Sequence, residues 1–517
     1  MFAFALWDRE ENTLWLVRDR MGIKPLYYMI ENDRCAFASE LKAFAALPGW
    51  QRRLDTTAAY EMLRLGYVPG EQSILEGVRR LPPGHLMKVS LADGSPRADE
   101  PATYWSLDTF ASKSPDLQDE HEAKEQISGL IEDAVGMRMV ADVPLGAFLS
   151  GGIDSTLVTA AMQRQSPTPI KTFSIGFSDE AYDEAGDAKR IAKHLGTEHH
   201  ELYVAERDML DLVVAITEMY DEPFADSSQL PTALLARLTR EHVTVALSGD
   251  GGDELCAGYT RHFQAARIDR LFRLPGPLRK ITGRVLQSVS VASWDRTARW
   301  LRRSMRLPGD KLHKLGSVLT ADNTQELYEA VAASGDMSRL WRGPRPSRAL
   351  ATGWPRTGMT SGERFVLQDM RRYLPDDILT KVDRATMAFG LEARVPLLDH
   401  RLIELAWRIP FRLKVKQGQG KWLLREILAG WVPETLWNRP KMGFSVPIGG
   451  WLKGPLKEWS EYHLLDAHFY RAHGLLDRDV VTQWWQQHLR GSANHQHRLW
   501  NILMFHAWYD RWLHQTT

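Results

Sequence analysis

The stretch that decides the fold reads Leu149-Ser150-Gly151-Gly152-Ile153-Asp154-Ser155-Thr156. It follows an apolar run at 143–149, which predicts a buried strand, and precedes an apolar run at 157–162, which predicts the start of a helix. Two glycines between strand and helix let backbone N–H groups approach an anion, and the helix N-terminus adds a positive dipole end. Asp154 adds an oxygen ligand of the kind that Mg²⁺ prefers. The stretch therefore predicts a loop that holds a polyphosphate.

This loop differs from the Walker loop, because G-x-x-x-x-G-K-[ST] does not occur in the sequence. The pattern S-G-G-x-D-S instead resembles the pyrophosphate loop of the N-type ATP pyrophosphatases. Members of that family cleave ATP between its α and β phosphates and hold pyrophosphate in the loop. A plain serine-glycine turn in another α/β fold is the alternative interpretation of the motif taken alone.

Strand-like and helix-like runs alternate after the loop, which is typical of a parallel, doubly wound sheet. Further strands are expected at 170–177, 198–204 and 243–247, and a helix at 185–195. Ligands of such sheets bind beyond the carboxyl ends of the strands. Ser150, Gly176 and Ser248 lie at three of these ends, so we expect three loops to converge on one site.

A second acidic loop, Ser248-Gly249-Asp250-Gly251-Gly252-Asp253-Glu254, directly follows the strand at 243–247. Carboxylates beside the phosphates of ATP repel them unless a cation lies between. We expect Asp154 and Asp253 to hold one Mg²⁺ from opposite loops, where it would neutralise charge on departing pyrophosphate. A merely polar or Ca²⁺-like turn is the alternative interpretation.

The N-terminal section has a different pattern, with short strands expected at 1–7, 14–17, 26–29, 35–38 and 86–89. Residues 92–120 are rich in Asp, Ser, Pro and Ala and lack periodicity, which predicts a linker. A helical spacing of apolar residues at 122–139 then leads into the strand before the first loop. A chain of 517 residues is long enough for the two domains that this division implies.

Two runs, Phe2-Ala3-Phe4-Ala5-Leu6-Trp7-Asp8 and Arg18-Asp19-Arg20-Met21-Gly22-Ile23-Lys24-Pro25-Leu26-Tyr27-Tyr28, resemble the second half of a class II glutamine amidotransferase domain. That family has a nucleophilic cysteine directly after the initiator methionine, where this chain has Phe2. Cys35 lies within an expected strand and is interpreted as an inert buried thiol. We therefore expect an incomplete glutaminase, with apolar strand surface exposed near Phe2 and Phe4 and poor solubility.

Four more runs complete a pattern: 373–384, 391–400, Gly420-Lys421-Trp422-Leu423-Leu424-Arg425 and Arg439-Pro440-Lys441-Met442-Gly443-Phe444. In this order, and together with both acidic loops, they resemble the synthetase domain of glutamine-hydrolysing asparagine synthetases. The resemblance implies a partial glutamine amidotransferase domain at 1–108. It implies a doubly wound α/β domain of the ATP-pyrophosphatase fold, with a helical C-terminal part, at 109–517.

The resemblance also implies the chemistry: ATP-dependent amidation of L-aspartate to L-asparagine through β-aspartyl-AMP, with release of AMP and pyrophosphate. The implied residues are Leu149, Ser150, Gly151, Gly152, Ser155, Ile175, Ser248 and Gly249 for ATP, Asp154 and Asp253 for Mg²⁺, and Asp250, Lys441 and Arg384 for catalysis. Asp250 would support formation or breakdown of the acyl-adenylate. Lys441, and in second place Arg384, would stabilise charge on the transferring phosphate.

Two alternatives stay open. A β-lactam synthetase-like or peptide-cyclising relative would adenylate a carboxylate and close a ring, using a tyrosine-based dyad near the second acidic loop. Asp250 in that loop favours amide formation between separate molecules. The other alternative is a non-catalytic amidotransferase-like scaffold, against which the retained ATP loops argue.

Composition limits the partners. Lysine plus arginine equals aspartate plus glutamate, 65 each, which argues against nucleic acid or a membrane surface. Two cysteines fit a reducing cytoplasm, and no apolar run approaches the roughly 20 residues of a membrane span. We expect a cytoplasmic enzyme whose partners are aspartate, ATP and ammonia or glutamine, and the sequence leaves a homodimer open.

Two clusters receive ordinary interpretations. Arginines between Arg296 and Arg306 alternate with apolar residues, which favours a solvated helix face over an RNA-binding patch. The histidines at 488, 495, 497 and 506 lack zinc-site spacing, which favours surface histidines.

Overall fold

The computed structural model of the protein describes residues 1–31, 34–91, 95–177, 184–204, 206–271, 274–289, 293–294, 297, 308–335, 337–344, 358–439 and 446–514. The arginine cluster between Arg296 and Arg306, and Lys441, lie outside these residues. No helix in the described part of the chain has the length and apolar character needed to cross a membrane.

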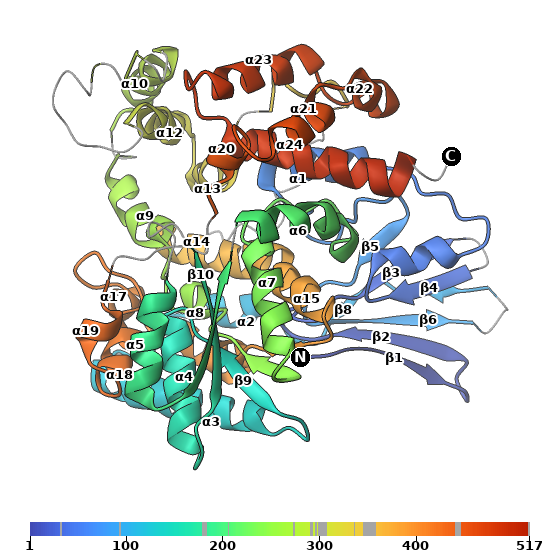
Figure 1. Ribbon diagram of the computed structural model, residues 1–517. Helices are drawn as coiled ribbons and strands as arrows, with labels where there is room; N and C mark the ends of the chain where they lie inside the picture. The colour runs from blue at the N-terminus through green and yellow to red at the C-terminus, as the bar shows by residue number, and fades with distance from the viewer. Residues whose placement is uncertain are drawn as a thin grey trace.

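Two antiparallel sheets form the N-terminal section, at the right of Figure 1. Their strands are β1 (Ala3–Asp8), β2 (Thr13–Arg18), β3 (Tyr27–Glu31), β4 (Arg34–Ala38), β5 (Val78–Arg80), β6 (His85–Ser90), β7 (Arg97–Ala98) and β8 (Ala102–Thr103). One sheet has the order β1-β2-β6-β7, with β8 also paired to β6, and the other has the order β4-β3-β5. The strands expected from the sequence are confirmed, and β5 adds a short one that the sequence pattern did not indicate.

The prediction of a linker at 92–120 is wrong for much of its length. Strands β7 and β8 pair with β6, and helix α2 (Leu107–Ala111) buries Leu107 and Ala111 in the core beside Leu117. Two-residue strands and a single helical turn are too short to produce a hydrophobic period, so their position is set by the elements they pack on.

Strand β1 has a neighbour only on one side, β2, in the part of the sheet that the structure describes. Phe4, Leu6 and Trp7 are 45%, 53% and 42% exposed, whereas Phe2 is half-buried. The expected apolar surface is therefore present at Phe4 and continues along β1. Edge strands with exposed apolar residues favour association between chains.

We predict that Leu6→Lys reduces self-association, because a charge on an edge strand opposes strand pairing between molecules. Light scattering of the purified chain at increasing concentration should fall relative to the parent protein, as should binding of a hydrophobic dye. Ser114→Lys adds the same charge at another exposed position and should change neither. Equal effects of the two variants would contradict a role for the β1 surface.

The second sheet is parallel throughout, as the sequence predicted. Its strands are β9 (Leu145–Phe148), β10 (Lys171–Phe177), β11 (Glu198–Val204), β12 (Val245–Leu247) and β13 (Glu392–Arg394), in the order β11-β10-β9-β12-β13. Strand β13 is not among the strands expected from the sequence. Its three residues include Glu392 and Arg394, so no apolar run marks it, and its pairing with β12 alone defines it.

Both faces of this sheet are buried, each in its own core. Phe173 and Ile175 of β10 belong to one hydrophobic cluster, whereas Val245 and Leu247 of β12 belong to another. Ala246, between them in the sequence, returns to the first cluster, as the two-residue period of a strand requires. Helices α4 (Ile153–Gln165) and α5 (Ala185–Leu195) pack in the second cluster, and α7 (Gln229–Arg240) packs in the first.

The strand order reverses direction at β9. The chain runs outward from β9 to β10 and β11, then returns to place β12 on the opposite side of β9. Because the connections on the two sides leave in opposite directions, a crevice opens beyond the carboxyl ends of β9 and β12. The pairing of Ala147 with Leu247 brings the loops that follow these strands to the same level.

The remaining helical elements surround the sheet and extend above it, with α20 to α24 at the top of Figure 1. They are η1 (Leu41–Ala46), α1 (Thr56–Leu65), α3 (Glu120–Met139), α6 (Glu206–Met219), α8 (Gly252–Leu255), α9 (Thr260–Leu271), α10 (Gly276–Ser288), α12 (Pro308–Thr320), α13 (Thr324–Ala332), α14 (Ser361–Gln368), η3 (Asp369–Leu379), α15 (Thr380–Met387), η4 (Pro396–Leu398), α16 (His400–Arg408), α17 (Phe411–Lys414), α18 (Trp422–Ala429), α19 (Glu434–Trp437), α20 (Ile448–Trp451), α21 (Lys457–Leu465), α22 (Ala467–His473), α23 (Arg478–Leu489), α24 (Gln496–Tyr509) and η5 (Asp510–His514). The helical C-terminal part predicted from the resemblance is confirmed.

The interpretation of the late histidines as surface residues is wrong for two of them. His506 and His488 are buried, and the His506 ring stacks on Phe469 with a centroid distance of 4.9 Å. Burial lowers the pKa of His506 to about 3, so it is neutral at physiological pH and packs as an aromatic residue.

Candidate active site

A cavity of about 770 Å³ lies at the reversal point of the parallel sheet, within the size range of small-molecule sites. Of the residues predicted from the sequence, its lining includes Leu149, Ser150, Gly152, Asp154, Ser155, Ile175, Ser248, Gly249, Asp250 and Asp253. Gly151 belongs to the same loop but is not a lining residue. The tertiary structure thus brings both acidic loops and the end of β10 to one site.

The first loop is folded tightly at the start of α4. The backbone N–H of Ser150 donates to Ser155 Oγ at 3.2 Å, and the hydroxyls of Ser150 and Ser155 are 3.0 Å apart. Gly151 has φ of +74°, and a Cβ there would lie 3.1 Å from the backbone N of Ala188. Gly152 is the N-cap of α4, a helix of 13 residues. The loop therefore lies at the positive end of the helix dipole. The geometry suits an anion in this loop.

The second loop lies directly against the first. A Cβ on Gly249 would be 2.6 Å from the backbone N of Ser155, and a Cβ on Gly252 would overlap the carboxylate of Asp154. The Ser248 hydroxyl donates to Asp250 Oδ2 at 2.7 Å and holds that carboxylate in place. Glycine is therefore required where the two loops meet, which explains why both are glycine-rich.

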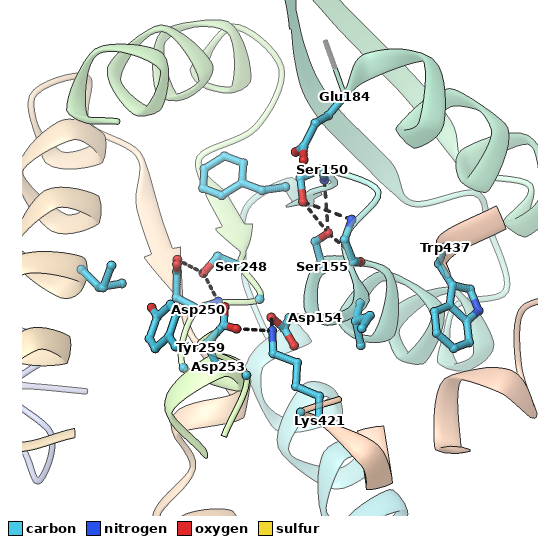
Figure 2. A pocket seen from close by; sticks show the side chains of 18 of the residues that line it. Ser150, Asp154, Ser155, Glu184, Ser248, Asp250, Asp253, Tyr259, Lys421 and Trp437 are labelled. Atoms are coloured by element: carbon cyan, nitrogen blue, oxygen red, sulfur yellow. Dashed lines mark hydrogen bonds and ion pairs between the residues drawn. The ribbon is translucent and has the colours of Figure 1, made fainter. Parts of the chain in front are cut away.

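A buried ammonium group joins the two predicted metal ligands. Lys421 Nζ lies 2.7 Å from Asp253 Oδ1 and also contacts Asp154 Oδ2, as Figure 2 shows. Burial opposes the charge on Lys421, but Asp154 and Asp253 outweigh it and raise the pKa of the ammonium. The lysine is therefore a permanent cation between the two loops.

The position of Lys421 also tests whether these carboxylates fit a metal ion. One cation contacts both of them, so the two carboxylates lie within reach of a single ion. In the described part of the chain no group of three or more histidine, cysteine, aspartate and glutamate side chains could hold a metal. A Mg²⁺ ion here would complete its shell with phosphate oxygens and water, as Mg²⁺ commonly does.

Two further cations border the cavity. Arg439 Nη2 donates to the backbone O of Ser150 at 3.2 Å, and Arg439 also pairs with Asp187. Lys381 Nζ lies 2.8 Å from both Asp226 Oδ2 and Ser228 Oγ. Sequence reasoning assigned no role to Lys421, Arg439 or Lys381, although all three lie in runs that carried the family resemblance.

Two acidic groups that line the cavity have altered pKa values. Burial raises the pKa of Asp250, although the Ser248 hydroxyl and the charge of Lys381 oppose the shift. Burial and the nearby charge of Asp253 raise the pKa of Glu254 to about 7. Glu254 Oε1 accepts a hydrogen bond of 2.6 Å from the Tyr259 hydroxyl. Perturbed carboxylates in a cleft are typical of reaction sites, which supports the interpretation of this cavity.

Arg384 lies elsewhere. It is 4% exposed and does not line the cavity. Its guanidinium is 3.3 Å from Glu40 and 3.4 Å from Asp221, and it donates to the backbone O of Ser39 at 3.0 Å. These contacts join α15 to the N-terminal section. They favour a structural role at this junction, and the catalytic role stays a prediction without a contact to the cavity.

Other buried ion pairs make up the same junction. Arg80 pairs with Glu222 at 3.0 Å and with Asp376 at 3.3 Å, and Lys24 pairs with Asp383 at 2.7 Å. Each pair links the N-terminal section to the segments around the parallel sheet. Because Arg80 and Asp376 are buried, each depends on its partner for compensation.

We predict that Arg384→Gln lowers the free energy of unfolding by about 3–5 kcal/mol, because it leaves the buried Asp221 without its guanidinium partner. The measurement is equilibrium unfolding in urea. Arg408→Gln is the matched control, since Arg408 and Asp116 form an exposed pair at 2.9 Å. That variant should change the free energy by less than about 1 kcal/mol. Equal midpoints for both variants would show that the junction does not depend on Arg384.

Sequence comparisons place this geometry in a known class of enzymes. A family model described as asparagine synthase matches residues 126–510, and one described as glutamine amidotransferase domain matches residues 1–105. Asparagine synthetase [glutamine-hydrolyzing] 1 of Bacillus subtilis is 30% identical over 513 residues, covering 99% of this chain and 77% of that protein. A putative asparagine synthetase [glutamine-hydrolyzing] of Mycobacterium bovis is 35% identical over 531 residues, covering 98% and 76%.

More distant proteins match as well. Amidase chyE of Penicillium rubens is 26% identical, covering 88% of this chain and 70% of that protein. A solved structure of NMN synthetase from Francisella tularensis covers 27% of this chain and 57% of that one, at 16% identity and a TM-score of 0.19. At so low a TM-score the assignment of the fold rests on the strand order alone.

The parallel sheet, with a phosphate-type loop at its reversal point and an amidotransferase-type section before it, defines a two-part ligase. The chain belongs to the asparagine synthase family.

Proposed function

We propose that this chain catalyses ATP-dependent amidation of L-aspartate to L-asparagine through β-aspartyl-AMP. The observation that carries the proposal is the single cavity in which the first loop, Asp250 and the cations Lys421, Arg439 and Lys381 meet. It combines donors and cations for a triphosphate with the carboxylate of Asp250. The reaction is proposed from family membership, and the residues that line the cavity support it.

The reaction balances in two steps. In the first, an oxygen of the aspartate side-chain carboxylate bonds to the α-phosphorus of ATP, and the bond from that phosphorus to the bridging oxygen breaks. Pyrophosphate leaves with the electron pair. In the second, ammonia bonds to the acyl carbon, the bond to the phosphate oxygen breaks, and AMP leaves while the nitrogen loses a proton. Both steps place negative charge on phosphate oxygens.

The residues of the first loop are proposed to hold the departing pyrophosphate. Ser150, Gly151, Gly152 and Ser155 offer hydroxyl and backbone donors at the start of α4. Leu149 and Ile175, both buried beside the cavity, are proposed to contact the nucleoside, with Ser248 and Gly249 also touching ATP. Arg439 and Lys441 would stabilise charge as it develops on the phosphates.

Asp250 lines the cavity, and we propose that it supports the formation or breakdown of the acyl-adenylate. Its raised pKa makes the carboxyl a better proton acceptor than an ordinary aspartate, which suits removal of a proton from attacking nitrogen. Mg²⁺, held by Asp154 and Asp253, would neutralise charge on the triphosphate. A cytoplasmic location remains a prediction from the sequence, which leaves a homodimer open.

We predict that aspartate stimulates ATP–pyrophosphate exchange at least about tenfold more than glutamate, because one extra methylene in a fitted site costs about 1–3 kcal/mol. The measurement is incorporation of labelled pyrophosphate into ATP by the purified chain with magnesium chloride. Asp154→Asn should lower the exchange on the order of a hundredfold, because a charged group beside the phosphates is lost. Asp142→Asn, an exposed aspartate just before β9, is the control and should leave exchange unchanged. Near-normal exchange by Asp154→Asn would remove the first loop from the site.

A ring-forming activity is the second candidate, and one observation favours it. The Tyr259 hydroxyl donates to Glu254 at the cavity wall, so a tyrosine–carboxylate pair lies beside the second acidic loop. The same exchange experiment separates the candidates. Exchange that ignores aspartate but responds to a bulkier carboxylate would favour ring closure.

The nitrogen source follows from the thiols of the chain. A class II glutaminase needs a reactive thiolate, and the 517 residues contain two thiols, Cys35 and Cys256. Burial raises the pKa of Cys35, and burial raises the pKa of Cys256 to about 12. Neither thiol is therefore a reactive thiolate at physiological pH.

We predict that the 517-residue chain forms asparagine from ammonium and not from glutamine. The test supplies ATP, Mg²⁺ and aspartate with either nitrogen source and measures asparagine and glutamate. Asparagine should appear with ammonium, while glutamate release from glutamine should not exceed the background without protein. Glutamate formed at the rate of asparagine would refute the interpretation of the N-terminal section.

A further inference from the structure

The backbone conformation at Lys421 places the ammonium of this residue between the two acidic loops. Lys421 has φ of +60°, a conformation that side chains other than glycine rarely adopt, at the residue before α18. Its backbone N–H donates to the O of Cys256 at 2.9 Å, which ties the segment to the second loop. The start of α18 is thus anchored beside Asp253.

Two glycines make this approach feasible. A Cβ on Gly420 would overlap the backbone O of Ala257, and a Cβ on Gly258 would overlap both Lys421 Cε and Asp253 Oδ1. The lysine stem therefore passes so close to Gly258 that a side chain there would collide with it. A strained lysine and two close backbone approaches at one point indicate a specific role for the ammonium.

We propose that Lys421 is an exchangeable counter-ion: it holds Asp154 and Asp253 together until the nucleotide–metal complex binds, then yields its place to the metal and pairs with a phosphate oxygen. The chemical identity of the nucleotide rests on the proposed function. The exchange itself rests on the contacts of Lys421.

Electrostatics makes the exchange necessary. Lys421 Nζ contacts both carboxylates that would bind the metal, and an ammonium and a divalent cation repel each other at such distances. The flexible four-carbon stem allows Nζ to move while the backbone stays bound to Cys256. Lys421 lines the cavity, so phosphate oxygens held by the first loop offer the ammonium a new partner.

This arrangement couples the binding of metal and nucleotide. A metal ion alone must displace Lys421 without offering it another anion, so it binds weakly. A metal ion that arrives with a triphosphate supplies that anion, so it binds tightly. The coupling is reciprocal by linkage, and each ligand strengthens the other by the same factor.

The probe is Mn²⁺, followed by electron paramagnetic resonance on the full chain, alone and with the ATP analogue α,β-methylene-ATP. In the parent protein we expect the analogue to tighten Mn²⁺ binding at least about tenfold beyond the affinity of Mn²⁺ for the analogue in solution. In Lys421→Met we expect Mn²⁺ alone to bind at least about tenfold more tightly than to the parent protein. The tightening by the analogue should shrink correspondingly.

Two variants control the result. Lys416→Met removes the same charge from a neighbouring half-buried position, where Lys416 pairs with Glu120, and should leave Mn²⁺ binding unchanged. Lys421→Arg keeps a cation on a stem that ends in a rigid fork, and should keep Mn²⁺ binding as weak as in the parent. Circular dichroism establishes that each variant is folded.

Several outcomes would overturn the proposal. Unchanged affinity of Lys421→Met for Mn²⁺ alone would exclude competition between the lysine and the metal. Parent protein that binds Mn²⁺ as tightly without the analogue as with it would do the same, even where Lys421→Met fails to fold. The Mn²⁺ measurement needs no turnover, so loss of aspartate-dependent exchange would refute the proposed reaction without touching this inference.

Discussion

The pairing of β9 with β12 is the constraint on which the site depends. The chain leaves these two strands toward opposite sides of the sheet, so a crevice opens beyond their carboxyl ends. The register places the loop after β9 against the loop after β12, at a distance so short that Gly249 and Gly252 allow no Cβ. Two loops about a hundred residues apart in the sequence thereby act as one surface.

Charge balance follows from that contact. Bringing Asp154 and Asp253 together in a buried place requires a cation, and the structure supplies Lys421 from a third segment. The same principle holds at Lys381, which lies between Asp226 and Ser228, and at the junction where Arg80 and Arg384 neutralise carboxylates. Each buried charge is costly alone, so the segments that carry opposite charges constrain one another's position. The N-terminal section and the parallel sheet are joined largely by such pairs, in addition to the hydrophobic core that they share.

Burial also changes the pKa values of the charged groups that line the cavity. Burial raises the pKa of Asp250 and Glu254, while the pKa of Lys421 is raised by its two partners despite burial. Each of these pKa shifts is therefore set by the surroundings of the group and not by residue type alone.

The sequence by itself determined the parallel sheet, the two acidic loops and the family, because strand-length apolar runs and glycine-rich loops are local patterns. It also indicated the apolar surface on β1, where Phe4 is 45% exposed. Only the tertiary structure revealed β13, a three-residue strand that exists through pairing with β12, and the ordered segment that replaces the expected linker. Only the tertiary structure placed Arg384 at the junction and Lys421 between the loops. Contacts between charges that are far apart in the sequence produce no periodic sequence pattern. A motif identifies the groups that are present. The tertiary fold decides which segments meet, and therefore which partner each buried charge has.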